Sequence, residues 1–126
     1  MVSINRVLIA GTLTRDPELR STASGKDVTS FSLAVNRRWR NREGEQQKDT
    51  NFFPVVVWNG TAKTCAQYLA KGKSVMVEGR LQIRSYVSKS GEQKSVSEII
   101  GESVTFLSPR QKEPENQEPL DDLVQE

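Results

Sequence analysis

The sequence contains no histidine and a single cysteine, Cys65. Without histidine, a Ser-His or Cys-His catalytic pair and a His-ligated metal site are excluded. One cysteine cannot form a disulfide within the chain, so a reducing compartment is the default expectation. The carboxylates follow no spacing that indicates catalysis. We therefore expect a protein that is not an enzyme and that needs no metal or cofactor.

Long apolar runs are also absent. No segment approaches the length of a membrane span, and the first six residues lack the hydrophobic stretch of a signal peptide. A chain of 126 residues with 35% hydrophobic and 27% charged residues fits one domain with a modest core. The expected location is the cytoplasm, with no membrane contact.

The net charge of +2 conceals an uneven distribution. Residues 1–110 hold 17 Lys and Arg against 10 Asp and Glu, a net charge of +7, whereas residues 111–126 carry −5. This segregation predicts an anionic partner for the basic part and a separate role for the acidic part, for which a merely solubilising terminus is the alternative. High charge and two prolines predict a short disordered acidic tail over residues 109–126, after a domain of residues 1–108.

Within that domain, five segments have strand patterns and one has a helix pattern. The strands are expected at residues 5–14, 28–40, 49–58, 75–86 and 93–106. A helix is expected over residues 61–71, because Ala62, Cys65, Ala66 and Leu69 fall on one helical stripe. Three strands, a helix and two strands is the order of the OB-fold, a five-stranded Greek-key barrel with its helix between strands three and four. All-β with one helix is the predicted fold class.

The strand at residues 75–86 has two unlike faces. Its odd positions from Val75 to Ile83 are apolar or glycine, which predicts a core face. Its even positions include Arg80, Arg84 and Tyr86. Cations match phosphates and rings match bases, so this second face suits single-stranded nucleic acid. An ordinary solvated strand face is the alternative.

Two further segments repeat this combination of cations and rings. Residues 37–42 place four arginines around Trp39. Residues 52–58 are apolar except at Pro54, and alternation sets Phe52 and Trp58 on the face opposite Phe53. Either those two rings lie on the surface, or the strand is buried on both faces. The OB-fold binds oligonucleotides or oligosaccharides on its strand 2–3 face and its neighbouring loops, where these segments are expected to lie.

The chain also resembles the bacterial single-stranded DNA-binding proteins over about residues 3–107. The resemblance is carried by Ile4-Asn5-Arg6-Val7-Leu8-Ile9-Ala10-Gly11, by Arg15-Asp16-Pro17-Glu18-Leu19-Arg20, by Tyr68-Leu69-Ala70-Lys71-Gly72 and by Val77-Glu78-Gly79-Arg80-Leu81. It implies a homotetramer that wraps single-stranded DNA during replication, recombination and repair. It also implies stacking of bases on Trp39, Phe52, Trp58 and Tyr86.

The remaining predicted contacts are cationic. The residues expected to contact phosphates are Arg37, Arg38, Arg40, Arg42, Lys48, Arg80, Arg84, Lys89 and Lys94. The resemblance further implies docking of replication and repair proteins on an acidic tail that ends in proline and phenylalanine. This chain offers Asp121, Asp122, Leu123 and Val124 without that final pair. RNA or oligosaccharide binding, or an adaptor that mainly contacts proteins, are the alternative functions.

Overall fold

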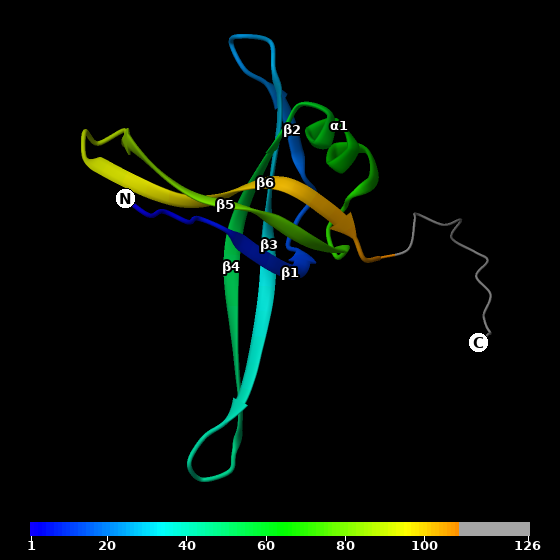
Figure 1. Ribbon diagram of the computed structural model, residues 1–126, viewed down its shortest axis with the longest axis vertical. Coiled ribbons are helices and arrows are strands. Elements are labelled where there is room, and N and C mark those ends of the chain that lie inside the picture. Colours follow the sequence, from blue (N-terminus) through cyan, green and yellow to red (C-terminus); the bar gives the residue numbers. More distant parts are fainter. Residues whose placement is uncertain (109–126) are drawn as a thin grey trace, which may run out of the picture.

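The computed structural model describes residues 1–108. The predicted acidic tail, with Asp121, Asp122, Leu123 and Val124, lies outside the described residues. The elements are, in chain order, β1 (Val7–Leu13), β2 (Glu18–Ser21), β3 (Asp27–Arg40), β4 (Gln46–Trp58), α1 (Asn59–Tyr68), β5 (Ser74–Val87) and β6 (Gln93–Phe106). The helix α1 lies between β4 and β5, where the sequence predicts a helix (Figure 1).

Five of the strands close into a barrel. They follow the order β1-β5-β6-β4-β3, and β1 pairs with β3 at Thr12↔Ala34 to complete the ring. All pairings are antiparallel except β4 with β6, where Val55 lies beside Ile99. The predicted OB-fold is therefore confirmed.

One strand of the structure was not predicted. The short β2 pairs only with β3, along Glu18↔Ser30 to Ser21↔Asp27, and all four of its residues are exposed. A segment without a buried face has no apolar alternation, which is the signal that predicts strands. The five predicted strands therefore omit β2, which adds only an edge strand beside β3.

The barrel interior is filled by alternate residues of the strands and by one face of α1. Its buried members include Leu13, Phe31, Leu33, Val55, Val57, Ala62, Cys65, Leu69, Val75, Val77 and Ile99. The helix is held to β3 by Thr29, whose hydroxyl is fully buried and donates a 2.7 Å hydrogen bond to the carbonyl of Ala62. A buried hydroxyl needs such a partner, so this bond fixes α1 against the barrel end.

The helix begins and ends earlier than predicted. It starts at Asn59, two residues before the expected position, and no side chain of the described residues caps it. It stops at Tyr68 because later backbone donors find tertiary partners: Lys71 N–H donates to the carboxylate of Asp16 at 2.9 Å, and Gly72 N–H donates to the carbonyl of Leu13 at 2.9 Å. Such partners replace the i→i−4 bonds of another helical turn.

Two glycines permit close backbone contacts in the barrel wall. A Cβ at Gly11 would lie 2.5 Å from the carbonyl oxygen of Ala34, where β1 meets β3. A Cβ at Gly79 would lie 1.9 Å from the carbonyl oxygen of Ile100, next to a register shift in the β5–β6 ladder. Both sites therefore exclude any side chain.

Two hairpins extend beyond the barrel in different directions, one formed by β3 and β4 and the other by β5 and β6 (Figure 1). The β5–β6 hairpin explains why the prediction of a core face along the whole of residues 75–83 was wrong. Val75, Val77 and Gly79 face the core, but Leu81 and Ile83 are exposed although they share the same alternation. The strand continues past the barrel there, so the face that is buried at its start meets no core at its end.

Candidate nucleic-acid interface

Three neighbouring strands form one continuous surface on the outside of the barrel. Directly opposed residues of a ladder share a face. Ile100 of β6 is opposite Val56 of β4 on one side and Arg80 of β5 on the other, so the three belong to one surface. We call it the outer face. It also carries Phe52, Trp58, Gln82, Arg84, Tyr86, Val96 and Glu98, which alternate with core-facing or opposite-facing neighbours.

The aromatic rings of β4 lie on this outer face. Phe52 is 63% exposed and Trp58 is 38% exposed, whereas Val55 and Val57 between them are fully buried. The alternative of a strand buried on both faces is thereby excluded. Tyr86 of β5 is 44% exposed and lies directly opposite Lys94 of β6. Rings left open to solvent on a shared surface can accept stacked planar groups.

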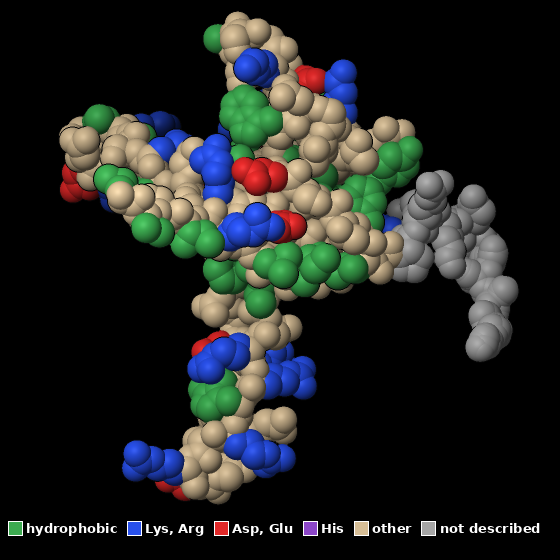
Figure 2. All heavy atoms as spheres, viewed as in Figure 1, with side chains coloured by type: hydrophobic (Ala, Val, Ile, Leu, Met, Phe, Trp, Pro, Cys, Tyr) green, Lys and Arg blue, Asp and Glu red, His purple; other side chains and the backbone are tan. Residues whose placement is uncertain are grey.

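The part of the β3–β4 hairpin from Asn36 to Thr50 pairs with no other strand, and we call it the basic arm. Lys and Arg side chains gather along this hairpin (Figure 2). Arg38 lies directly opposite Lys48, and the structure gives neither cation an ion pair within residues 1–108. Like charges opposed across a ladder repel each other, so this pair favours an anionic ligand.

Trp39, in the basic arm, belongs to the opposite face of the β3–β4 ladder from Phe52 and Trp58. Its ladder partner is Gln47, and alternation groups it with Arg37 and Val35 rather than with Arg38. The guanidinium of Arg37 lies 4.2 Å from the centre of the indole ring, a cation–π contact that covers one ring face. Trp39 and the pair Phe52 and Trp58 therefore lie on opposite faces of the β3–β4 ladder.

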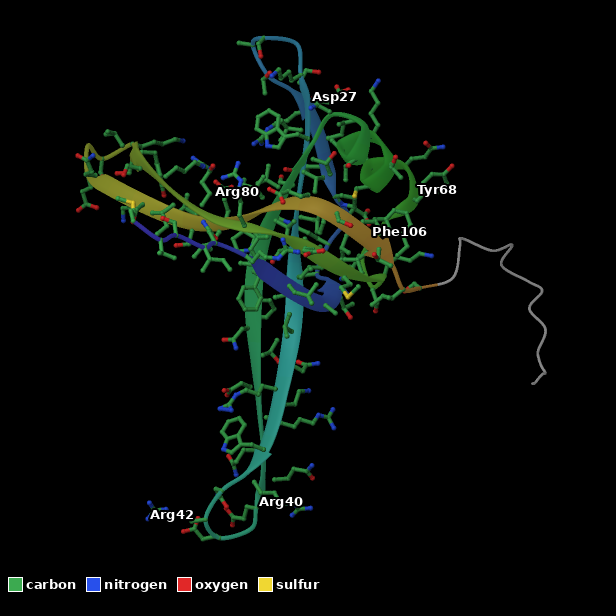
Figure 3. The ribbon with its side chains drawn as sticks, viewed as in Figure 1. Asp27, Arg40, Arg42, Tyr68, Arg80 and Phe106 are labelled. Atoms are coloured by element: carbon green, nitrogen blue, oxygen red, sulfur yellow. The ribbon has the colours of Figure 1, made fainter. Side chains whose placement is uncertain are left out.

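Three other predicted cations lie at hairpin tips. Arg40 and Arg42 lie at the end of the basic arm (Figure 3). Arg40 donates a 2.9 Å hydrogen bond from Nη1 to the carbonyl of Gly44, so it also supports the turn. Lys89 lies in the turn between β5 and β6, where Ser88 N–H donates to the carbonyl of Glu92. These residues extend the positive charge beyond the outer face itself.

The remaining three predicted cations are already paired with carboxylates. Arg84 Nε lies 2.5 Å from Glu98 Oε1, Arg80 Nε lies 3.6 Å from Glu102, and Lys94 lies 3.4 Å from Glu92. Glu98 stands out because it is only 6% exposed, and no other charged side chain of residues 1–108 is buried. Sequence reasoning missed these carboxylates, although the β5–β6 hairpin register could have indicated them.

Nothing in residues 1–108 indicates a catalytic or metal site on this surface. The described part of the chain holds no cluster of three metal-ligating side chains, and none of its helices is long and apolar enough to span a membrane. Cys65 lies in the core, where desolvation by burial raises the pKa of its thiol from 9.0 to about 11. It is a small buried side chain rather than a reactive nucleophile.

Comparison with known proteins agrees with this geometry. The model of the single-strand binding protein family matches residues 4–107. The chain belongs to this family.

Curated relatives in the family include bacterial proteins. The chain is 42% identical over 123 residues to single-stranded DNA-binding protein 1 of Staphylococcus aureus strain Mu50. This match covers 98% of this chain and 78% of the relative. It is 49% identical over 107 residues to the single-stranded DNA-binding protein of Halalkalibacterium halodurans, covering 85% of this chain and 62% of the relative.

A solved structure matches as well. The single-stranded DNA complex of the Plasmodium falciparum SSB superposes with a TM-score of 0.80 at 29% identity, covering 86% of this chain and 98% of that one.

Proposed function

We propose that this chain binds single-stranded DNA with little sequence preference and protects it during replication, recombination and repair. Its relatives are named for single-stranded DNA binding, and the matching solved structure is a complex with single-stranded DNA. The observation that carries the proposal is the exposure of Phe52 and Trp58 on a face that also presents arginines. An exposed ring beside cations suits a nucleotide, whose base stacks while its phosphate is neutralised.

The mechanism divides between stacking and charge. Bases stack on Phe52, Trp58 and Tyr86 of the outer face and on the uncovered side of Trp39, each worth on the order of 1–3 kcal/mol. Every base has a planar face, so stacking tolerates all sequences. Phosphates follow the cations of the basic arm, above all Arg38 and Lys48, whose mutual repulsion they relieve. No step in this mechanism requires bond cleavage, so we propose a binding protein and not an enzyme.

The assembly we propose is a homotetramer, as in the family resemblance. Apolar side chains left exposed in one copy support this assignment. Leu8 of β1 and Leu81 and Ile83 of β5 are exposed, and the side chain of Asn5 forms hydrogen bonds with both backbone groups of Leu81, which holds the N-terminal segment along β5. Leu81 and Ile83 share one face of β5, and exposed apolar residues on one face mark a surface that another chain can cover.

Two further roles remain proposals. The cytoplasm, next to the nucleoid, is the proposed location, because that is where single-stranded DNA is exposed in a bacterial cell. Replication and repair proteins are proposed to dock on Asp121, Asp122, Leu123 and Val124, which lie outside the described residues. The acidic character of that segment, −5 over residues 111–126, supports a basic docking partner.

Competition between ligands tests the proposal. We expect fluorescently labelled oligo-dT to be displaced by unlabelled single-stranded DNA of any sequence, less well by duplex DNA, and not by a neutral oligosaccharide. Displacement by RNA at lower concentration than by DNA would favour the RNA alternative. Failure of the protein to bind any polynucleotide at low salt would favour an adaptor that contacts proteins.

A further inference from the structure

The outer face contains one buried carboxylate, Glu98, in a region that otherwise presents cations and rings. Glu98 lies on β6 directly opposite Gln82, one residue before the point where β6 pairs with β4. It is 6% exposed, and within residues 1–108 the one hydrogen-bond partner of its carboxylate is Arg84, at 2.5 Å. A buried carboxylate is tolerated only with a partner of this kind.

Arg84 is held from one edge only. Its Nε donates to Glu98, while the side chain remains 54% exposed and its two terminal nitrogens form no hydrogen bond within residues 1–108. A guanidinium has five N–H donors in a planar fork, so bonding one edge to a carboxylate leaves the other edge available to a phosphate. Tyr86 lies two residues further along the same face, about 7 Å away along the strand.

We propose that Glu98 is a positioning residue for DNA binding: it holds the guanidinium of Arg84 so that the terminal nitrogens face a phosphate of the strand whose base stacks on Tyr86. This inference rests on the proposed function. Immobilising a long side chain on binding opposes association, and a side chain fixed beforehand avoids that loss. Arg38 and Lys48, which form no ion pair within the described part of the chain, lack this advantage.

The competing interpretation is that Glu98 merely opposes DNA through its negative charge. Glu98→Gln and Glu98→Met separate the two, because both remove the same charge but only glutamine keeps an oxygen that accepts from Arg84. Binding of oligo-dT is measured at roughly 1 M salt, where the Debye length is about 3 Å and long-range repulsion is screened. Positioning predicts the highest affinity for the wild type, a lower affinity for Glu98→Gln and the lowest for Glu98→Met. The total loss from wild type to Glu98→Met should be about 2- to 12-fold. Equal affinity of the two variants, or a gain in either, overturns the proposal.

A double-mutant cycle shows whether Glu98 acts through Arg84. Arg84→Lys keeps the charge but loses the fork, so we expect it to weaken binding about as much as Glu98→Met, and the double variant to be no weaker than either. Additive losses contradict the proposal. Thermal unfolding of each variant without DNA reports stability separately, since a purely structural role lowers the Tm without changing the affinity of folded protein.

Glu102→Gln is the matched control. This carboxylate pairs with Arg80 at 3.6 Å and is 62% exposed, so it imposes little geometry. We expect its affinity at high salt to equal that of the wild type; a loss as large as that of Glu98→Met contradicts a special role for Glu98. If the wild type itself does not bind oligo-dT, the proposed function fails, whereas a wild type that binds with no order among the Glu98 variants refutes this inference alone.

Discussion

The neighbouring phenylalanines of β4 allow stacking to be separated from folding. Phe52 is 63% exposed on the outer face, and Phe53 packs against the core on the opposite side of the strand. Phe52→Ala should lower DNA affinity by about 1–3 kcal/mol, roughly 5- to 160-fold, because one stacking ring is lost. It should change the free energy of unfolding by no more than about 0.5 kcal/mol, since the ring contributes little to the core.

Phe53→Ala is the control and should behave in the opposite way. Deleting a ring from a core costs about 3–5 kcal/mol, and a partly buried ring falls at or below the lower end of that range. Affinity per folded protomer should change little. Titration with oligo-dT and urea denaturation measure the two effects. If Phe52→Ala destabilises the fold while sparing DNA binding, the assignment of the outer face is refuted.

Three other substitutions test separate features of the structure. Changing both Arg38 and Lys48 to Gln should stabilise the free protein against urea by about 0.2–1 kcal/mol, because the repulsion between the two cations is relieved, and a fall in stability would contradict that repulsion. The same double change should weaken DNA binding and reduce the slope of log K against log salt by about 0.7 for each lost phosphate contact. Gly79→Ala should cost at least about 1–3 kcal/mol by forcing the carbonyl of Ile100 to move, whereas Gly60→Ala, with nothing within 4 Å of its Cβ, should be neutral or stabilising. The raised pKa of Cys65 means that the folded protein keeps a proton that the unfolded chain loses, so stability should fall as pH rises from 9.0 towards about 11; Cys65→Ala should abolish that fall in pH-dependent denaturation, and its persistence would place the titrating group elsewhere.

Much of the fold could be predicted because most strands have one buried face. The alternation of Phe31, Leu33 and Val35, and of Phe53, Val55 and Val57, indicates strands directly, and β6 begins and ends at the predicted residues. The strand β2 has no buried face and left no such pattern. The end of α1 depends on Asp16 and Leu13, which are distant in sequence and therefore invisible to a local rule.

The candidate site could be predicted only in part. Exposure of Phe52 and Trp58 follows from alternation once one face is assigned to the core. The same rule, applied along β3, would have separated Trp39 from those rings, because Trp39 has the parity of the buried Phe31. Burial of Glu98 could not be predicted, since an isolated carboxylate in a strand ordinarily indicates a solvent-facing position.

The central claim, that single-stranded DNA stacks on the outer face, is tested most directly with a protein that has one tryptophan. Trp39→Phe leaves Trp58 as the only indole of the chain. Its emission is followed during titration with oligo-dT, while the anisotropy of a labelled oligonucleotide confirms binding independently. We predict marked quenching that saturates together with the anisotropy. Unchanged emission at saturating DNA would show that the strand binds elsewhere and would contradict the account.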